Sequence, residues 1–172
     1  NTGNGTDFGD LSVKNDAGSS GVNSPTRGII MGGISFNNRI ELIEMSSSGG
    51  HVDFGNLSTT RGNVAGMSSS TRGICGGGRN PTFTDTIEYI TIASTGDAIN
   101  FGNLAAARCY TAGCNNFQRG VVAGGTTPTV VNTIEFITIV SAGDAADFGD
   151  LSQARGYVSG LSNAHGGLSQ GY

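Results

Sequence analysis

One five-residue phrase is repeated four times along the chain, and this repetition constrains the fold more than any other feature. Each copy has the form Asp/Asn-Phe-Gly-Asp/Asn-Leu, and its phenylalanines are Phe8, Phe54, Phe101 and Phe148. These phenylalanines are 46, 47 and 47 residues apart. A fixed period of this size indicates a stack of equivalent units, each of which needs its neighbours to bury its apolar face.

The period divides the chain into repeat units. Residues 1–11 carry the end of a preceding repeat, and residues 152–172 begin a partial fourth repeat. Three complete repeats lie between them, at 12–57, 58–104 and 105–151, and together they are predicted to form one domain. Because the chain begins inside a repeat and without Met, we expect it to be a fragment or a processed product.

Each complete repeat contains four strand-like phrases. The third is the strongest, because residues 87–92 and 134–139 are runs of β-branched and aromatic residues bounded by Gly, Asn and Ser. The second follows an arginine and closes on glycines, as in residues 119–125. Four short strands in every ~47 residues predict an all-β fold of four-stranded antiparallel blades, forming a complete β-propeller ring or part of one.

Recurring framework residues have structural roles in this architecture. Glycines at the end of the second strand permit close approach of backbones in the blade interior, and the phenylalanines fill the space between blades. One arginine and one glutamate per repeat suggest a repeated ion pair or backbone cap, and an anion-binding ring of arginines is the functional alternative. These residues are Gly33, Gly77 or Gly78, Gly125, Arg27, Arg72, Arg119, Glu41, Glu88 and Glu135.

Composition and charge exclude several classes of protein. The net charge of −4 gives no electrostatic footprint for nucleic acid. No apolar run approaches the ~20 residues of a membrane span, so membrane insertion is not expected. The chain has 30 glycines, a composition that is compatible with disorder, but its regularly spaced apolar runs indicate a folded chain instead.

Two patterns resemble ligand sites without matching them. Gly76–Gly78 lacks the Lys-Ser/Thr that completes a phosphate-binding loop, and its recurrence in other repeats favours a structural role. Asp144, Asp147 and Asp150 are three residues apart, whereas an EF-hand spaces its ligands at alternate positions and ends in Glu. Aspartate also suits turns, so a bound cation is the alternative and a turn is the prediction.

The histidines and cysteines do not have metal-ligand spacing. His51 lies in a predicted turn, and His165 replaces an arginine of the repeat. Cys109 and Cys114 flank one predicted strand and point to opposite faces, which disfavours a disulfide between them. Both cysteines are interpreted as small buried apolar residues. We therefore expect no catalytic residues, no metal and no cofactor.

The order of the phrases resembles the kelch repeat: an arginine, a strand, Gly-Gly, a β-rich strand, then an aromatic residue and Leu before the next arginine. Kelch repeats usually carry Trp where this chain has Phe. The wording of Asp-Phe-Gly-Asp-Leu and of residues 69–73, 132–139 and 162–168 is similar to kelch-like repeats in virion structural proteins of marine phages, notably cyanophages. The resemblance covers almost the whole chain.

The resemblance implies a non-enzymatic structural protein on the surface of a virion, of the tail-fibre or appendage type. Its expected partners are other virion proteins, further copies of itself, and a glycan or protein of the host surface. An intracellular kelch-type adaptor is the alternative, and an enzyme on a propeller scaffold is a further one. Because an unclosed blade leaves exposed strand edges, we expect either that the native chain continues on the amino side or that another copy completes the ring.

The segment between the second and third strands varies between repeats, while the framework around it does not. Function tends to lie on loops held by a rigid scaffold, so these loops are predicted to bind sugars through ring stacking and polar contacts. Loop drift without function is the alternative. The predicted binding residues are Phe36, Asn38, Arg39, Arg79, Asn80, Phe83, Thr127 and Val130.

Overall fold

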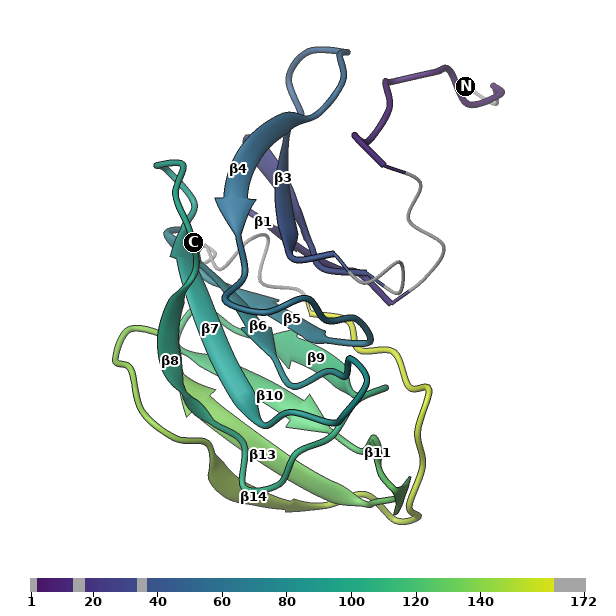
Figure 1. Ribbon diagram of the computed structural model, residues 1–172, viewed down its shortest axis with the longest axis vertical. Helices are drawn as coiled ribbons and strands as arrows, with labels where there is room; N and C mark the ends of the chain where they lie inside the picture. The colour runs from purple at the N-terminus through teal and green to yellow at the C-terminus, as the bar shows by residue number, and fades with distance from the viewer. Residues whose placement is uncertain (1–2, 14–17, 34–36, 163–172) are drawn as a thin grey trace.

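The structure, a computed structural model, describes residues 3–13, 18–33 and 37–162. The prediction of an all-β chain is confirmed, because these residues form strands, turns and bends and no helix. Nothing in the described ranges is therefore a helix that could cross a membrane. The strands form three four-stranded antiparallel sheets, one in each complete repeat (Figure 1).

Each sheet is a meander in which successive strands pair in chain order. The first sheet consists of β1 (Ser20–Asn23), β2 (Arg27–Met31), β3 (Arg39–Glu44) and β4 (Val52–Asn56). The second consists of β5 (Ala65–Ser68), β6 (Arg72–Gly76), β7 (Thr86–Thr91) and β8 (Ile99–Asn103). The third consists of β9 (Ala112–Asn115), β10 (Arg119–Ala123), β13 (Thr133–Thr138) and β14 (Ala146–Asp150). A small hairpin, β11 (Thr126–Thr127) and β12 (Thr129–Val130), lies between β10 and β13.

The third and fourth strands of every sheet share one irregularity. Their register shifts at an Ile-Glu pair, and such bulges bend a strand and re-aim the side chains beside them. The glutamate is buried in all three sheets, with 1–4% of its surface exposed. The shifts lie at Ile40/Glu41, Ile87/Glu88 and Ile134/Glu135.

The hydrophobic core lies between neighbouring sheets. One cluster joins residues of the first and second sheets, and another joins residues of the second and third; we call these boundaries the first seam and the second seam. The inner strands β1, β5 and β9 lie side by side, and the third sheet ends the series at the bottom of the view (Figure 1). This arrangement is consistent with blades of a β-propeller, although the described residues do not close a ring.

Two short segments flank the three sheets. Residues 7–11, which we call the amino-terminal arm, lie against the turn that follows β3. The backbone N–H groups of Gly49 and His51 donate to the carbonyls of Phe8 and Asp10, at 2.7 and 3.1 Å. At the other end, the segment after β14 returns to the inner strands, where Tyr157 continues a series described below.

Candidate functional site

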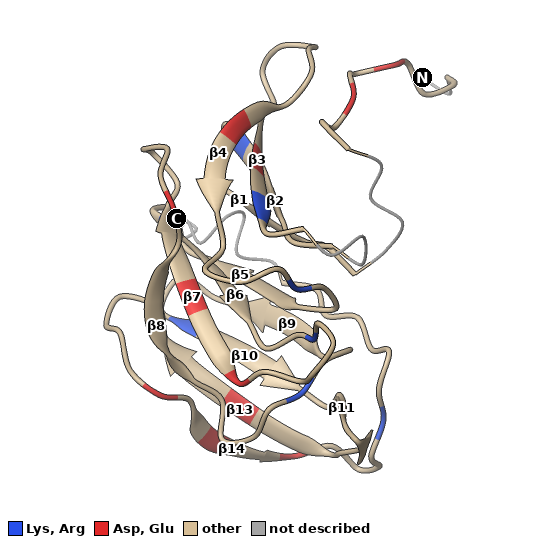
Figure 2. Cartoon of the chain, viewed as in Figure 1, with Lys and Arg blue, Asp and Glu red and all other residues tan. Residues whose placement is uncertain are grey.

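The recurring glutamates make buried polar contacts within their own repeats. Glu88 Oε2 accepts a hydrogen bond from Arg61 Nη2 at 2.6 Å, and its Oε1 accepts one from the N–H of Ser58 at 3.0 Å. Glu135 bonds Arg108 Nη2 at 2.5 Å in the same way. Figure 2 shows the acidic bands that cross β7 and β13. The ion pair is therefore made with the arginine that precedes the first strand, and not with Arg72 or Arg119.

Burial makes these ion pairs costly to break. Both partners are about 98–99% buried, and removing one partner of a buried pair leaves an uncompensated charge. Burial lowers the pKa of the Arg108 guanidinium, and the nearby Glu135 carboxylate acts in the opposite direction. The pairs join the start of a repeat to its third strand and are part of the scaffold.

The first sheet departs from this pattern. Its glutamate, Glu41, accepts hydrogen bonds from the backbone N–H of Ser12 at 3.0 Å and from the Ser12 hydroxyl. Its Oε1 also lies 3.8 Å from Nε2 of His51. Asn15, which follows Lys14, stands in the sequence where the other repeats have their paired arginine, and it lies outside the described residues.

The arginines that begin the second strands reach across the seams. Arg27 Nη1 donates to the carbonyl of Ile92 at 2.9 Å, and Arg72 Nη1 donates to that of Ile139 at the same distance. These are backbone caps between neighbouring sheets. Arg119 occupies the same position on the third sheet, where it is exposed.

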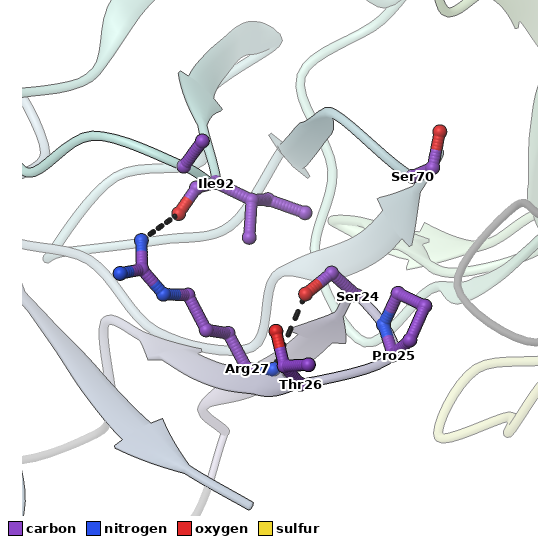
Figure 3. Close-up of a pocket in the computed structure, with 7 residues that line it drawn as sticks. Ser24, Pro25, Thr26, Arg27, Ser70 and Ile92 are labelled. Atoms are coloured by element: carbon purple, nitrogen blue, oxygen red, sulfur yellow. Dashed lines mark hydrogen bonds between the residues drawn. The ribbon is translucent and has the colours of Figure 1, made fainter.

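A depression of about 420 Å³ lies beside Arg27 at the first seam (Figure 3). Ser24 Oγ accepts from the N–H of Arg27 at 3.2 Å, and the guanidinium of Arg27 is bonded to Ile92, so these polar groups are already engaged with one another. At the second seam the sequence position of Ser70 is taken by Phe117. We therefore attribute the depression to the small side chain of Ser70, which leaves space that a phenylalanine would fill. Its lining residues are Ser24, Pro25, Thr26, Arg27, Ser70, Ile92 and Ala93.

The glycine pairs that end the second strands are buried at the seams. Gly77 and Gly78 have φ of +65° and +111°, which favours glycine. A Cβ on Gly77 would lie 2.6 Å from the carbonyl oxygen of Arg108, and the N–H of Gly78 donates to that oxygen at 2.8 Å. Gly33 and Gly125 donate in the same way to an arginine carbonyl of the next repeat.

The variable loops share one face with the connections between repeats. Backbone bridges join Arg79 to Gly62 and to Phe83, and the Arg79 guanidinium carbon lies 5.8 Å from the centre of the Phe83 ring. Asn80 Nδ2 donates to Thr60 Oγ1 at 2.6 Å. We call this surface the loop face; it consists of residues 57–64, 77–85, 104–111, 124–132 and 151–159.

Two of the three binding residues predicted in the first repeat make hydrogen bonds within the framework. Asn38 Nδ2 donates to the carbonyl of Leu57 at 3.1 Å. Arg39 is the first residue of β3 rather than a loop residue, and its Nη1 donates to Ser12 Oγ at 3.2 Å. Phe36 lies outside the described residues.

The corresponding loop of the third repeat forms the β11–β12 hairpin. Thr127 is half-buried, and Val130 is exposed. A Cβ on Gly156 would lie 3.5 Å from Val130 Cγ1, so the hairpin contacts the segment that carries Tyr157. The loops of the second and third repeats therefore lie beside a feature that sequence reasoning missed.

That feature is a series of backbone hydrogen bonds between equivalent residues of successive repeats. The N–H of Asn63 donates to the carbonyl of Gly18 at 2.6 Å, that of Tyr110 to Asn63 at 3.1 Å, and that of Tyr157 to Tyr110 at 3.0 Å. We call these four residues the axial ladder. Their φ angles are 72°, 59°, 57° and 55° in chain order, a left-handed conformation that is uncommon for tyrosine. Strained backbone of this kind is concentrated at functional sites.

The two tyrosines of the ladder stack on each other. The ring centres of Tyr110 and Tyr157 are 4.0 Å apart and the ring planes differ by 26°. Tyr157 is 77% exposed. A side-chain hydrogen bond with Tyr110 raises the pKa of Tyr157. The sequence signal for this pair was an aromatic residue two positions after the arginine that precedes the first strand, in two successive repeats.

A depression of about 450 Å³ lies beside the tyrosine pair. Thr111 lines it and is 93% buried, and no described residue is a hydrogen-bond partner of its hydroxyl. The site thus combines a flat aromatic surface with polar groups. Its lining residues are Gly18, Asn63, Val64, Tyr110, Thr111, Tyr157, Val158 and Ser159.

The cysteines are poor nucleophiles in this structure. Burial raises the pKa of Cys109 to about 11, and the positive charge of Arg79 acts in the opposite direction. Burial also raises the pKa of Cys75 and of Cys114, and the reactive thiolate is disfavoured in each case. In the described ranges, no three His, Cys, Asp or Glu residues are grouped so that they could hold a metal ion.

The structure thus brings together only part of the predicted binding set. Arg79 and Val130 lie near Tyr157 or its neighbour Gly156, and Phe83 contacts Arg79. Asn38 and Arg39 instead bond to the framework of the first sheet. No protein-family model and no curated protein sequence matches the chain.

Proposed function

We propose that the protein is a non-enzymatic structural component of a phage virion, of the tail-fibre or appendage type. In this proposal its repeats are kelch-like blades of a β-propeller, and its loop face binds glycans on the host surface. The observation that carries the proposal is the stacked pair of half-buried Tyr110 and exposed Tyr157 beside a depression on the loop face.

The chemistry of the depression suits a sugar. A pyranose ring has an apolar face of C–H groups and a rim of hydroxyls, and an exposed tyrosine ring offers a flat partner for the apolar face. Asn63 and Ser159 line the depression with polar side chains that can bond the hydroxyl rim. The site therefore offers both kinds of contact that a glycan needs.

The backbone of the site supports the proposal because it is held in place before any ligand binds. Hydrogen bonds of the axial ladder fix Tyr110 and Tyr157, and each ring restricts the other. A preorganised site loses less conformational freedom on binding. A shallow site of this kind has modest affinity alone, but many copies on one particle bind a glycan-covered surface with high avidity.

The virion assignment is supported by the wording of the repeats, which resembles virion structural proteins of marine phages along almost the whole chain. Mass spectrometry of purified particles of the phage that encodes the chain tests this assignment directly. We expect the chain to be a component of the particle. Its absence from purified particles would contradict the assignment without affecting the glycan proposal.

Glycan binding is tested with Tyr157→Asn on glycan arrays and on host cells. Asparagine is chosen because Asn63 holds the equivalent position with φ of 59°, close to the 55° of Tyr157, so the backbone should be unchanged. Loss of the ring should weaken binding at least about tenfold, or ~1.4 kcal/mol, with the same melting temperature.

Phe117→Ala is the matched control. Phe117 is 44% exposed and lies in the turn between β9 and β10, at the opposite end of the strands from the loop face. This variant should bind like the wild type. Equal binding by Tyr157→Asn would exclude the tyrosine site, and binding that survives enzymatic removal of host glycans would indicate a protein receptor instead.

A further inference from the structure

Neighbouring sheets are joined along one edge by backbone hydrogen bonds that recur at each seam. At the first seam the N–H of Gly96 donates to Phe54 at 2.7 Å, and that of Ala98 donates to Asn56 at 2.8 Å. The two equivalent bonds at the second seam have the same lengths. In both cases the fourth strand of one sheet accepts, and the turn after the third strand of the next sheet donates.

A side-chain contact at each seam accompanies these bonds. Asp97 Oδ1 accepts from the N–H of Asn56 at 2.8 Å, and Asp144 Oδ1 accepts from that of Asn103 at 2.9 Å. The asparagine amides lie 3.4 and 3.5 Å from the same oxygens. At each seam an asparagine on the fourth strand therefore faces an aspartate on the turn.

The amino-terminal arm occupies the position of a fourth strand on the first sheet, with a different side-chain pair. Phe8 and Asp10 accept backbone bonds from Gly49 and His51, in the pattern found at the seams. However, Asp10 stands where the seams have asparagine, and Gly50 stands where they have aspartate. His51 Nδ1 also lies 3.1 Å from the Asp10 carbonyl. The first sheet can thus pair with a segment that carries Asp10, because its turn has Gly50 where the other turns have aspartate.

The far edge, β14, presents the same five residues as the arm. Residues 147–151 and 7–11 both read Asp-Phe-Gly-Asp-Leu. Phe148 is 55% exposed, and a Cβ on Gly149 would meet nothing within 4 Å. If a unit with the turn of the second or third sheet docked here, Asp150 would face an aspartate, and such like-charge contacts select against a partner. Charge complementarity therefore favours the turn of the first sheet.

The side chains exposed at the two ends of the molecule also correspond to pairs that meet within the seams. Met45 holds the position of Ile92 and Ile139, which are 1% and 0% exposed at the seams, yet Met45 is 43% exposed. On the open face of the third sheet, Arg119 and Phe148 line a groove of about 480 Å³. In the seams, the arginines equivalent to Arg119 bond the carbonyls of Ile92 and Ile139. The phenylalanines equivalent to Phe148 belong to the same hydrophobic clusters as these two isoleucines.

We propose that two copies of the chain associate head to tail, with β14 of one copy replacing the arm on residues 49–51 of the next. Phe148 is then covered by Met45, and Arg119 bonds the Met45 carbonyl. The arm is readily displaced because its residues 7–10 are exposed and no described strand pairs with it, whereas β14 is backed by β13. The two surfaces differ, so the interface repeats into a ring or a filament.

Sedimentation of the full chain over a range of concentrations tests this proposal. A Cβ at position 9 would lie 2.1 Å from the carbonyl oxygen of Gly49, so Gly9→Val should release the arm and strengthen association at least about tenfold. Phe148→Asp and Met45→Asp, at opposite ends, should each weaken association by at least about tenfold. Val140→Asp is the control, because Val140 is 65% exposed and belongs to neither surface.

A mixture of two variants distinguishes this interface from a symmetric one. Phe148→Asp retains an intact turn, and Met45→Asp retains an intact β14, so together they should form one-to-one dimers that grow no further. A symmetric dimer gives no such rescue, and that outcome would overturn the proposal. Wild-type and Gly9→Val chains that both stay monomeric up to millimolar concentration would overturn it as well, and the edge would then belong to a different protein or to further repeats.

Discussion

The seams and the ends of the molecule carry the same phenylalanine in different surroundings. Phe54 and Phe101, at the seams, are each 3% exposed, whereas Phe8 and Phe148, at the ends, are 43% and 55% exposed. The local sequence around all four is nearly identical. The sequence of the repeat therefore places each phenylalanine where it can fill a seam, but the ring is buried only where another sheet packs against it.

The largest difference in stability between a seam and an end is expected when the phenylalanine is replaced by alanine. Phe101→Ala opens a cavity in the second seam and should destabilise the fold by about 3–5 kcal/mol. Phe148→Ala removes an exposed ring and should change stability by no more than about 0.5 kcal/mol. Urea unfolding of the monomeric chain measures both. Equal losses would mean that Phe148 is covered in solution.

A smaller effect is expected at the glycine that follows. Gly102 and Gly149 have φ of +154° and +136°, so alanine strains both backbones. Only at Gly102 would the Cβ also meet an obstacle, the carbonyl oxygen of Gly143 at 2.2 Å. Gly102→Ala should therefore cost about 1–3 kcal/mol more than Gly149→Ala in the same unfolding assay. Equal losses of stability in the two variants would show that the two sheets can move apart at Gly102 without a cost in free energy.

The smallest effect concerns alkaline pH. Burial raises the pKa of Cys109 from 9.0 to about 11, so the unfolded chain loses this proton at lower pH than the folded chain. Stability from this thiol is present below pH ~9 and falls as the pH rises toward ~11. Cys109→Ala should flatten that fall in urea unfolding followed against pH. An unchanged slope would assign the fall to other groups, such as Cys75.

The repeat could be predicted from the sequence because its phrases are spelled out at a nearly constant spacing. The all-β fold follows from the β-branched third strands, and the place of Gly77 follows from its recurrence at the end of a strand. These inferences concern residues whose role is the same in each repeat. Recurrence alone identifies such residues.

Recurrence does not show which neighbour a residue contacts. Arg61 and Arg72 both begin an Arg-Gly phrase, yet Arg61 bonds Glu88 within its repeat and Arg72 caps Ile139 in the next. The axial site was missed for a similar reason. Tyr157 belongs to an apparent strand in the sequence, whereas in the structure its backbone is left-handed and bonds Tyr110 of the neighbouring repeat.

The axial ladder also has a direction. Each N–H in it points to the repeat before, and each carbonyl points to the repeat after. A unit that follows Tyr157 must present an N–H, because a unit added in the reverse sense would bring two carbonyl oxygens together. The ladder is therefore a template with a leading and a trailing side, and every further unit must stack on it in the same orientation.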